Sequence, residues 1–391
     1  MTFHAMKFVD KYAGWILCTL LSFIDFFIKP FKNNEGTAGL NSTKNILVMK
    51  FWGMGSIILS TPLLQALRGR FPGAKIHFLT LSRNRDIVKM FEPVDGVITL
   101  DIDHGPNGFL LSFIRIVRAM RKLKIDILFD LEFFTRFSAI VTYLSGARER
   151  IGFKAWEVWR GRLHTIGVPF NRYWHVTRNF YNLGKAAGIP EVKSMELLKP
   201  ELSTDEKSGT GALMEKYGLV PGKYACLNPN AGEIAMTRRW PKNNFAKLAA
   251  SILQKSPGIK IVFIGNPKEK QYVQSIISRI DAAGVISTAG ELNLEQLIII
   301  LKNSKLLVSN DSGPLHLAVA LGVPTISFFG PETPVLYGHS SEKNISFFKN
   351  LDCSPCINVH EDKTFRCDKK LPSCLEEITV EEVLEKVRLF L

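Results

Sequence analysis

Residues 45–59, NILVMKFWGMGSIIL, carry the pattern that decides the fold of this 391-residue chain. Residues 45–51 form an apolar run that predicts a buried strand. Gly53 and Gly55 follow this run, and a helical pattern then continues through Arg70. Glycines between a strand and a helix let the backbone come close to a ligand at the helix N-terminus. The stretch therefore predicts the first strand and helix of an α/β sheet with a ligand-binding loop.

The alternation of strands and helices continues through two halves of the chain. In the first half we predict further strands at residues 75–81, 96–100 and 126–131, with a helix at 109–123. A polar stretch at residues 201–211 ends this half. The second half then has predicted strands at residues 224–228, 260–265, 285–287, 306–309 and 324–329. We expect two Rossmann-like, doubly wound domains that face a cleft, because ligands of such sheets bind beyond the strand ends.

The composition indicates a globular chain with an anionic partner. Apolar residues make up 46% of the chain and charged residues 22%, enough for a large core and too apolar for general disorder. Residues 1–190 hold 26 Lys and Arg against 13 Asp and Glu, whereas the remainder holds 24 against 23. This excess favours a membrane surface or a phosphorylated lipid. Nucleic acid is not expected as a partner, because no motif of nucleic-acid readers is present.

The N-terminal segment predicts a helix that lies on a membrane. Residues 12–28 are strongly apolar, but they number only 17, contain Asp25 and have lysines on both sides, so a membrane span is not expected. A narrow stripe of polar or small residues recurs every three or four positions: Lys7, Lys11, Gly14, Cys18, Ser22, Asp25 and Lys29. This pattern is typical of an interfacial helix. The alternative is a helix packed on the protein's own surface; residues 33–39 read as a linker.

Cofactor motifs of other α/β enzymes are missing. The third glycine of a dinucleotide fingerprint is replaced by Ile58, and the next predicted strand offers no acid for a ribose. No Walker motif is present either. The sequence thus argues against a nicotinamide enzyme and against an NTPase.

Three strand-end loops of the second half carry polar residues suited to an anionic ligand. One begins at Asn228 and leads to Thr237, Arg238 and Arg239. The two arginines are cations that could hold a diphosphate. The next, residues 309–316, opens a helix, whose first N–H groups favour an anion. The third is residues 330–334. The alternative is that the two arginines are solvated and Trp240 is part of the core.

These loops and the opening strand bear a family resemblance. The segments ILVMKFWGMGSIILSTPLLQALRGRFPGAKI, NPNAGEIAMTRRWP and SNDSGPLHLAVALGVPTISFFGP resemble the heptosyltransferase-like glycosyltransferases, family 9, over roughly residues 45–391. The resemblance implies a glycosyltransferase B fold. It also implies inverting transfer, without a metal or other cofactor, of a sugar, commonly heptose from an ADP donor, to the core of lipopolysaccharide.

Site residues follow from the same resemblance, position by position. Arg238 stands where the family places a basic residue on the donor diphosphate. The family's donor motif falls on Asp311, Ser312, Gly313, Pro314 and His316. We therefore expect the donor to be bound by Gly55, Asn228, Thr237, Arg238, Arg239 and the residues of that motif.

The chain departs from the family where the catalytic base is expected. The family usually has Gly-Asp after the first strand, and this chain has Gly55-Ser56. A serine cannot act as that base unaided at neutral pH. We predict that Glu132, at the end of the fourth strand, is the general base, with Asp130 second and Ser56 a further catalytic candidate. The alternative is a sugar-nucleotide-binding relative that has lost transfer activity.

The sequence also contains candidate residues for binding the acceptor and for binding a metal. A basic stretch at residues 148–178 predicts an anionic glycolipid acceptor, with Arg136, Arg150 and Lys154 as candidate ligands. Six cysteines are too few for a disulfide-stapled fold and favour a reducing compartment. Four of them have spacings compatible with structural zinc, with reduced thiols as the alternative: Cys353, Cys356, Cys367 and Cys374.

We thus expect four segments. Residues 1–40 are the membrane-docking helix and linker, 41–205 the acceptor-binding domain, and 206–375 the nucleotide-sugar-binding domain. The family resemblance implies that residues 376–391 form a helix that returns to the first domain. The predicted location is the cytoplasmic face of the inner membrane, in peripheral contact with lipid.

Overall fold

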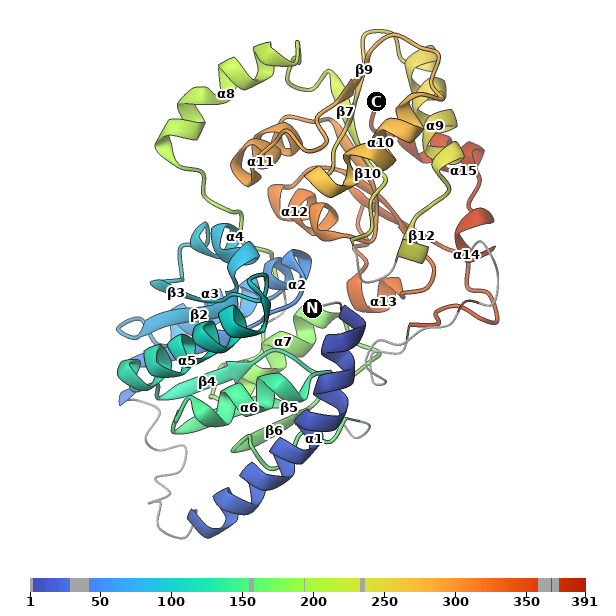
Figure 1. Ribbon diagram of the computed structural model, residues 1–391. Helices are drawn as coiled ribbons and strands as arrows, with labels where there is room; N and C mark the ends of the chain where they lie inside the picture. Colours follow the sequence, from blue (N-terminus) through green and yellow to red (C-terminus); the bar gives the residue numbers. More distant parts are fainter. Residues whose placement is uncertain are drawn as a thin grey trace. The chain divides into compact units, whose positions relative to one another are not determined.

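The computed structural model describes residues 3–28, 42–154, 158–192, 194–232, 236–357, 367 and 373–391. The chain divides into two compact units, one that runs to Leu198 and one that begins at Lys199 (Figure 1). Each unit is an α/β domain with its own sheet.

The sheet of the first unit has six parallel strands in the order β3-β2-β1-β4-β5-β6. The central strands are buried on both faces, which is why they consist of continuous apolar runs. The strands are β1 (Asn45–Met49), β2 (Lys75–Leu81), β3 (Gly96–Leu100), β4 (Ile127–Asp130), β5 (Glu149–Lys154) and β6 (Ile166–Pro169).

Helices cover both faces of this sheet. One face carries Leu47, Met49 and Leu128 and packs against α5 and α6. On α3 and α7, Leu63 and Gly184 lie close together. The helices of the unit are α1 (Phe3–Ile28), α2 (Met54–Leu59), α3 (Thr61–Arg70), α4 (Arg85–Lys89), α5 (Gly105–Leu123), α6 (Arg136–Leu144) and α7 (Val176–Lys185), with a 3-10 turn η3 (Ser82–Asn84).

Helix α1 lies beside α6. The face of α1 that contacts α6 is the one with Gly14 and Cys18 of the narrow polar and small stripe. Cys18 is fully buried in a cluster with Ala139 and Ile140 of α6. Gly14 is needed there, because a Cβ at this position would lie 2.9 Å from the Cβ of Arg136. Gly14, Cys18 and Asp25 of the predicted stripe thus face the protein, as the alternative of a helix packed on the protein's own surface predicts, and the helix still exposes a wide apolar face. Docking of this face on a membrane stays a prediction. No helix in the described residues has the length and apolarity that crossing a bilayer requires.

The second sheet repeats the topology of the first. Its six parallel strands follow the order β12-β11-β10-β7-β8-β9. Numbered from the start of each unit, both orders read 3-2-1-4-5-6, the arrangement of Rossmann-like folds. The strands are β7 (Tyr224–Asn228), β8 (Lys260–Phe263), β9 (Val285–Ser287), β10 (Leu306–Asn310), β11 (Thr325–Phe329) and β12 (Asn344–Phe348).

The core of the second unit is built around Trp240, which is fully buried and stacks on Phe328. Its indole N–H donates to the carbonyl of Ile378 at 2.9 Å, so the polar atom is paired as burial requires. The helices are α8 (Thr204–Lys216), α9 (Lys242–Lys255), α10 (Lys270–Ile277), α11 (Leu294–Lys302), α12 (Gly313–Leu321), α13 (Pro334–Tyr337), α14 (Ser373–Glu376) and α15 (Val380–Val387), with 3-10 turns η4 (Met236–Arg238) and η5 (Pro267–Glu269).

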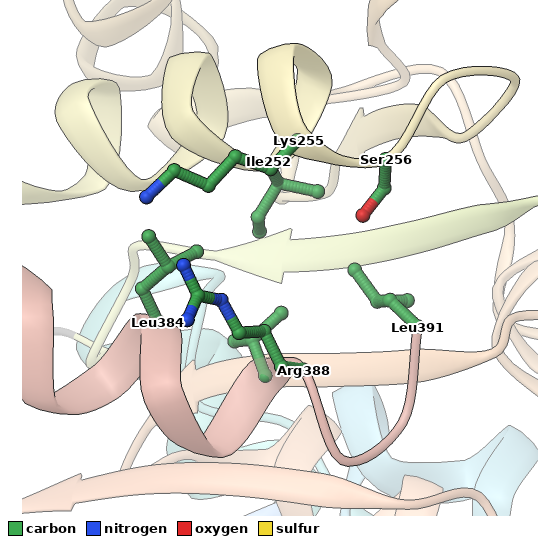
Figure 2. A pocket seen from close by; sticks show the side chains of 7 residues that line it. Ile252, Lys255, Ser256, Leu384, Arg388 and Leu391 are labelled. Carbon is green, nitrogen blue, oxygen red and sulfur yellow. The ribbon is translucent and has the colours of Figure 1, made fainter.

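The last helix packs within the second unit, and its predicted return to the first domain stays a prediction. Val380, Val383, Leu384 and Val387 of α15 recur at helical spacing and are buried in the core of the second unit. A pocket remains between α15 and the end of α9, with Lys255 and Arg388 on its walls (Figure 2). The apolar face of α15 is therefore used within the second unit.

Candidate active site

Each sheet has one switch point, where the strand order reverses and the following helices go to opposite faces. In the first unit it lies between β1 and β4, and in the second between β7 and β10. Ligands of doubly wound sheets bind beyond the carboxyl ends of the strands at this point. The loops that follow these four strands contain most of the residues that the sequence singled out.

In the second unit, Asn228 ties the two loops of the switch point together. Its side-chain amide donates to the hydroxyl of Ser309 at 3.0 Å and to that of Ser312 at 2.8 Å. Asn228 is buried to 99%. The structure thus gives this predicted donor-binding residue a positioning contact: it fixes the start of the loop that leads into α12.

Arg238 and Asp311 form the charged centre of the same switch point. One Nη of Arg238 lies 2.7 Å from Oδ2 of Asp311, and the other donates to the carbonyl of Ala231 at 2.8 Å. Asp311 is 4% exposed, whereas the Arg238 side chain is 20% exposed. The carboxylate therefore holds the guanidinium in place while part of the cation stays open to solvent.

Polar atoms next to this ion pair lack protein partners among the described residues. They are the Thr237 hydroxyl and the Nε atoms of Arg238 and Arg239. The Arg239 guanidinium lies 4.1 Å from the ring centroid of Tyr272. Buried polar atoms are normally paired, so an unsatisfied group of this kind indicates a ligand or water. Two donors and a hydroxyl suit the oxygens of a phosphate.

Helix α12 begins at the same place. Ser312 is its N-cap residue, but its hydroxyl donates to the carbonyl of Asn310 at 3.1 Å instead of capping the helix. Gly313 and Pro314 form the first turn, and Pro314 has no N–H to satisfy. The N-terminal end of α12, which has nine residues, therefore points its partial positive charge toward the Arg238–Asp311 pair.

His316 of α12 has a partner that sequence reasoning missed. Its Nδ1 lies 3.0 Å from Nε2 of His339, which follows α13, and its own Nε2 lies 3.9 Å from Oδ1 of Asp311. If His339 donates in this hydrogen bond, His316 carries its proton on Nε2, facing the carboxylate. Asp311 favours that tautomer because the N–H then points at negative charge. Nothing in the sequence around residue 339 marks this role, since the two histidines are 23 positions apart.

In the first unit, Glu132 occupies the switch point between β1 and β4. Its Oε1 accepts hydrogen bonds from the backbone N–H groups of Phe51 and Trp52, at 2.8 and 3.1 Å. Its Oε2 lies 2.8 Å from Nζ of Lys50, and both side chains are buried. Glu132 therefore holds the beginning of the loop that carries Gly55 and Ser56.

Asp130, the second candidate base, lies in a closed network. Its Oδ2 pairs with Arg160 and accepts from Ser138 at 3.1 Å, with Nε2 of His164 at 3.0 Å. Burial acts to raise the pKa of Asp130, but Arg160 and His164 outweigh it and the pKa is lowered. Burial also lowers the pKa of His164. A fully buried carboxylate with these partners is suited to stabilising the fold.

The three candidate acceptor ligands lie in different surroundings. Arg136 is the first residue of α6, 92% buried, and its Nε has no partner in the described part of the chain. Lys154 is exposed at the carboxyl end of β5. Arg150 lies toward the other end of β5, where its Nε donates to the carbonyl of Leu163 at 2.7 Å. The structure therefore does not place Arg150 with the other two.

Ser56 and Gly55 belong to the short helix α2, directly after the β1 loop. Gly55 is buried and Ser56 partly exposed. Gly53 before them has a φ of +83°, a conformation that side chains rarely adopt. The glycine loop is thus formed as the sequence predicts, with a serine where a carboxylate was expected.

The predicted zinc site is not supported. Cys374 is buried, Cys356 partly buried and Cys353 exposed, and burial raises the pKa of Cys374 to about 11. Within the residues that the structure describes, no three His, Cys, Asp or Glu side chains are arranged to hold a metal ion. The thiols are free.

Comparison with known proteins agrees with this geometry. Glycosyltransferase family 9 (heptosyltransferase) matches residues 113–365. The chain belongs to this family. This glycosyltransferase is 27% identical, over 357 residues, to lipopolysaccharide heptosyltransferase 1 of Campylobacter coli, a match that covers 88% of this chain and 98% of the relative.

Solved structures with the same fold extend over most of this glycosyltransferase. A family 9 glycosyltransferase from Veillonella parvula superposes with a TM-score of 0.72 at 21% identity, covering 89% of this chain and 97% of the other. The heptosyltransferase WaaC of E. coli, solved with ADP, gives a TM-score of 0.66 at 18% identity and covers 89% and 100%. The two-domain glycosyltransferase B fold expected from the sequence is thus confirmed.

Proposed function

We propose that this enzyme transfers heptose from ADP-heptose to an anionic glycolipid of the lipopolysaccharide core, with inversion and without a metal ion. The observation that carries the proposal is the Arg238–Asp311 pair at the second switch point, beside the Thr237 hydroxyl, which has no hydrogen-bond partner among the residues that the structure describes. The relatives named as lipopolysaccharide heptosyltransferases, and the ADP in one of the solved structures, support the choice of donor and acceptor.

The donor's diphosphate is proposed to bind at this pair. Arg238 would bind one phosphate through its exposed N–H groups, while Asp311 keeps the guanidinium oriented. The N-terminal end of α12 and the Thr237 hydroxyl would bind the other oxygens. When the bond from the sugar to ADP breaks, its electron pair stays on the phosphate. Arg238 and α12 would stabilise that charge and supply what a metal ion supplies in other transferases.

Inversion requires a hydroxyl of the acceptor to attack the anomeric carbon from the side opposite ADP. A general base must take the hydroxyl proton during this step. We propose Glu132 for that role, because Phe51 and Trp52 of the loop that lacks the usual Asp donate to its carboxylate. Glu132 has no exposed surface, so the loop must release it before the acceptor hydroxyl can bind.

The acceptor is proposed to bind through the cations at the same end of the first unit. The buried Nε of Arg136 has no hydrogen-bond partner in the described segments and Lys154 is exposed, so both can meet carboxylates or phosphates of a core glycolipid. Such an acceptor is anchored in a bilayer. The enzyme is accordingly proposed to act at the cytoplasmic face of the inner membrane, in peripheral contact with it.

A second candidate function is favoured by one observation, the Ser56 that replaces the usual Asp. A relative without a base would bind the nucleotide sugar and not transfer it. The two candidates differ in product formation and agree in donor binding.

The deciding experiment measures transfer from ADP-heptose to a core glycolipid in detergent, with and without EDTA, together with donor affinity by calorimetry. We expect transfer in both conditions, and we expect Glu132→Gln to lose turnover by about 10² to 10⁴ with unchanged donor affinity. Glu92→Gln, an exposed acid of the same unit, is the control.

Three outcomes would contradict parts of the proposal. Tight donor binding without any transfer would support the non-catalytic relative. Full turnover of Glu132→Gln would remove Glu132 as the base. Loss of transfer in EDTA, restored by a divalent ion, would contradict metal independence.

A further inference from the structure

Helix α1 presents an apolar face away from the protein. The exposed large apolar side chains span about 200° of the helix circumference, and each is at least 38% exposed: Phe8, Val9, Tyr12, Trp15, Ile16, Leu17, Leu20, Phe23, Ile24, Phe26 and Phe27. Thr19 lies among them, and its hydroxyl donates to the carbonyl of Trp15 at 2.9 Å. No charged residue of α1 lies within this arc. A soluble monomer rarely exposes so large a patch without a partner.

The opposite side of α1 is firmly attached to the first unit. Asp10 accepts hydrogen bonds from the backbone N–H groups of Arg136 and Phe137, at 3.0 and 2.7 Å, and so caps α6. Further along, Ser22 accepts from the N–H of Arg162 at 2.9 Å. Asp25 is buried and lies 4.0 Å from Arg150. These contacts fix which side of the helix is left exposed.

A second exposed apolar patch lies on α5. Leu110, Leu111 and Ile114 are exposed by 54%, 64% and 38%. Helix α5 contacts α6 through the rings of Phe109 and Phe113, which pack on Phe137. Since α1 packs on α6 as well, the two exposed patches belong to helices that flank α6 (Figure 1).

Positive charge accompanies both patches. Lys11 is exposed on α1, and α5 carries Arg115, Arg118, Arg121 and Lys122 on its surface. Helix α5 contains no acidic residue, and both acids of α1, Asp10 and Asp25, are used in contacts with the protein. An apolar surface with cations around it matches an anionic bilayer, where acyl chains meet the apolar groups and headgroups meet the cations.

We propose that α1 and α5 together form one lipid-binding surface, so that the enzyme docks on an anionic bilayer through two helices. This deepens the peripheral location proposed above, and it does not depend on the transfer reaction. A second copy of the chain fits less well, because a symmetric contact through this surface would bring like charges together.

The surface begins next to the proposed acceptor site. Asp10 contacts the first residues of α6, and Arg136 is the first of these. The N-terminal half of α1 therefore lies at the end of the first unit where Arg136 is found. A glycolipid that leaves the bilayer beside α1 would present its anionic core to this arginine.

The experiment is vesicle flotation of the full chain with phosphatidylglycerol–phosphatidylcholine vesicles, and with phosphatidylcholine alone. We expect binding to the anionic vesicles, and we expect Leu20→Glu on α1 and Leu111→Glu on α5 each to lower vesicle affinity by about tenfold or more. Leu389→Glu, which changes a 68%-exposed leucine of the second unit, should bind as the wild type does.

Each other result has a defined meaning. Wild-type binding by Leu111→Glu would remove α5 from the surface, and wild-type binding by both variants would overturn the proposal. Sedimentation that shows a dimer which Leu20→Glu dissociates would identify a second copy as the occupant. Transfer to a detergent-dispersed acceptor should persist in both variants, so a failure of docking is distinguishable from a failure of the proposed reaction.

Discussion

The two switch points have the same strand order, but they differ in whether their charged and polar groups are paired and buried. In the second unit, the Thr237 hydroxyl and the Nε of Arg238 are left without described partners beside a part-exposed cation. In the first unit, Lys50 and Glu132 are paired with each other and buried, and Asp130 is enclosed by Arg160 and His164. The same strand order thus supports an open, part-exposed cation in one domain, where we propose that the diphosphate binds, and a closed, charge-neutralised network in the other.

This difference between the two switch points affects how the proposed donor and the proposed acceptor would be bound. At the proposed donor site a diphosphate would meet groups that are already oriented, because Asp311 and Asn228 fix Arg238 and the start of α12. Preorganised charge of this kind is the main source of transition-state stabilisation in enzymes. On the acceptor side, the candidate base is held by backbone N–H groups and Lys50, so the first unit must rearrange before chemistry. We therefore expect Arg238 variants of the second unit to affect turnover. Apart from the proposed base Glu132, variants of the closed network around Asp130 in the first unit should affect stability.

Beyond the test of the proposed base Glu132, the largest effect is expected from Arg238→Ala. This change removes the exposed cation of the open site and leaves Asp311 without its partner, so turnover should fall by about 10² to 10³. Steady-state kinetics with ADP-heptose measures it, and Arg279→Ala, an exposed arginine of the same unit, is the control. Activity within a few-fold of the wild type would mean that the open site is not where the diphosphate binds.

The next effect tests the closed site through stability. Asp130→Asn breaks a buried ion pair and should lower the free energy of unfolding at pH 7 by about 3 to 5 kcal/mol. Because the folded-state pKa of Asp130 is lowered, its charge stabilises the fold above the unfolded-state pKa, and this contribution is lost as pH falls through the folded value.

The difference between wild type and Asp130→Asn should accordingly shrink below about pH 4. Urea unfolding at several pH values measures this difference, with Asp86→Asn, an exposed acid of α4, as the control. A constant difference across the acid range would show that the ionised carboxylate is not what stabilises the network.

How far the sequence predicted this molecule depends on how local each signal is. The central strands were predicted within a residue or two, because continuous apolar runs such as residues 45–49 mark strands buried on both faces. Strands β5, β6 and β12 were missed. The residues of the edge strands β6 and β12 are largely not buried in the structure, so their apolar pattern is weak. Strand β5 is mostly buried, but Glu149, Arg150 and Lys154 interrupt its apolar run.

Prediction of the site residues was limited in the same way, because their contacts join residues far apart in the sequence. Arg238 and Asp311 are 73 positions apart; their place in loops after predicted strands singled both out, and the family motifs assigned them to the donor. Arg150 was predicted to bind the acceptor from charge alone. Composition does not reveal that its guanidinium is used by the carbonyls of Leu163 and Ala147. The polar stripe on α1 was recognised. Which face of the helix contacts the protein, however, depends on the contact of Asp10 with α6, between residues 126 positions apart in the sequence.

The smallest effect concerns His339, which extends the open site by one residue. If His339 fixes the tautomer of His316, His339→Ala should lower turnover about fivefold, the value of one hydrogen bond, with little change in melting temperature. Gln can offer an N–H to Nδ1 of His316, so His339→Gln should recover most of the activity, which a purely structural contact would not require. His104→Ala, an exposed histidine of the first unit, is the control. Equal activities of the Ala and Gln variants would mean that the second histidine only fills space, and the open site would then end at His316.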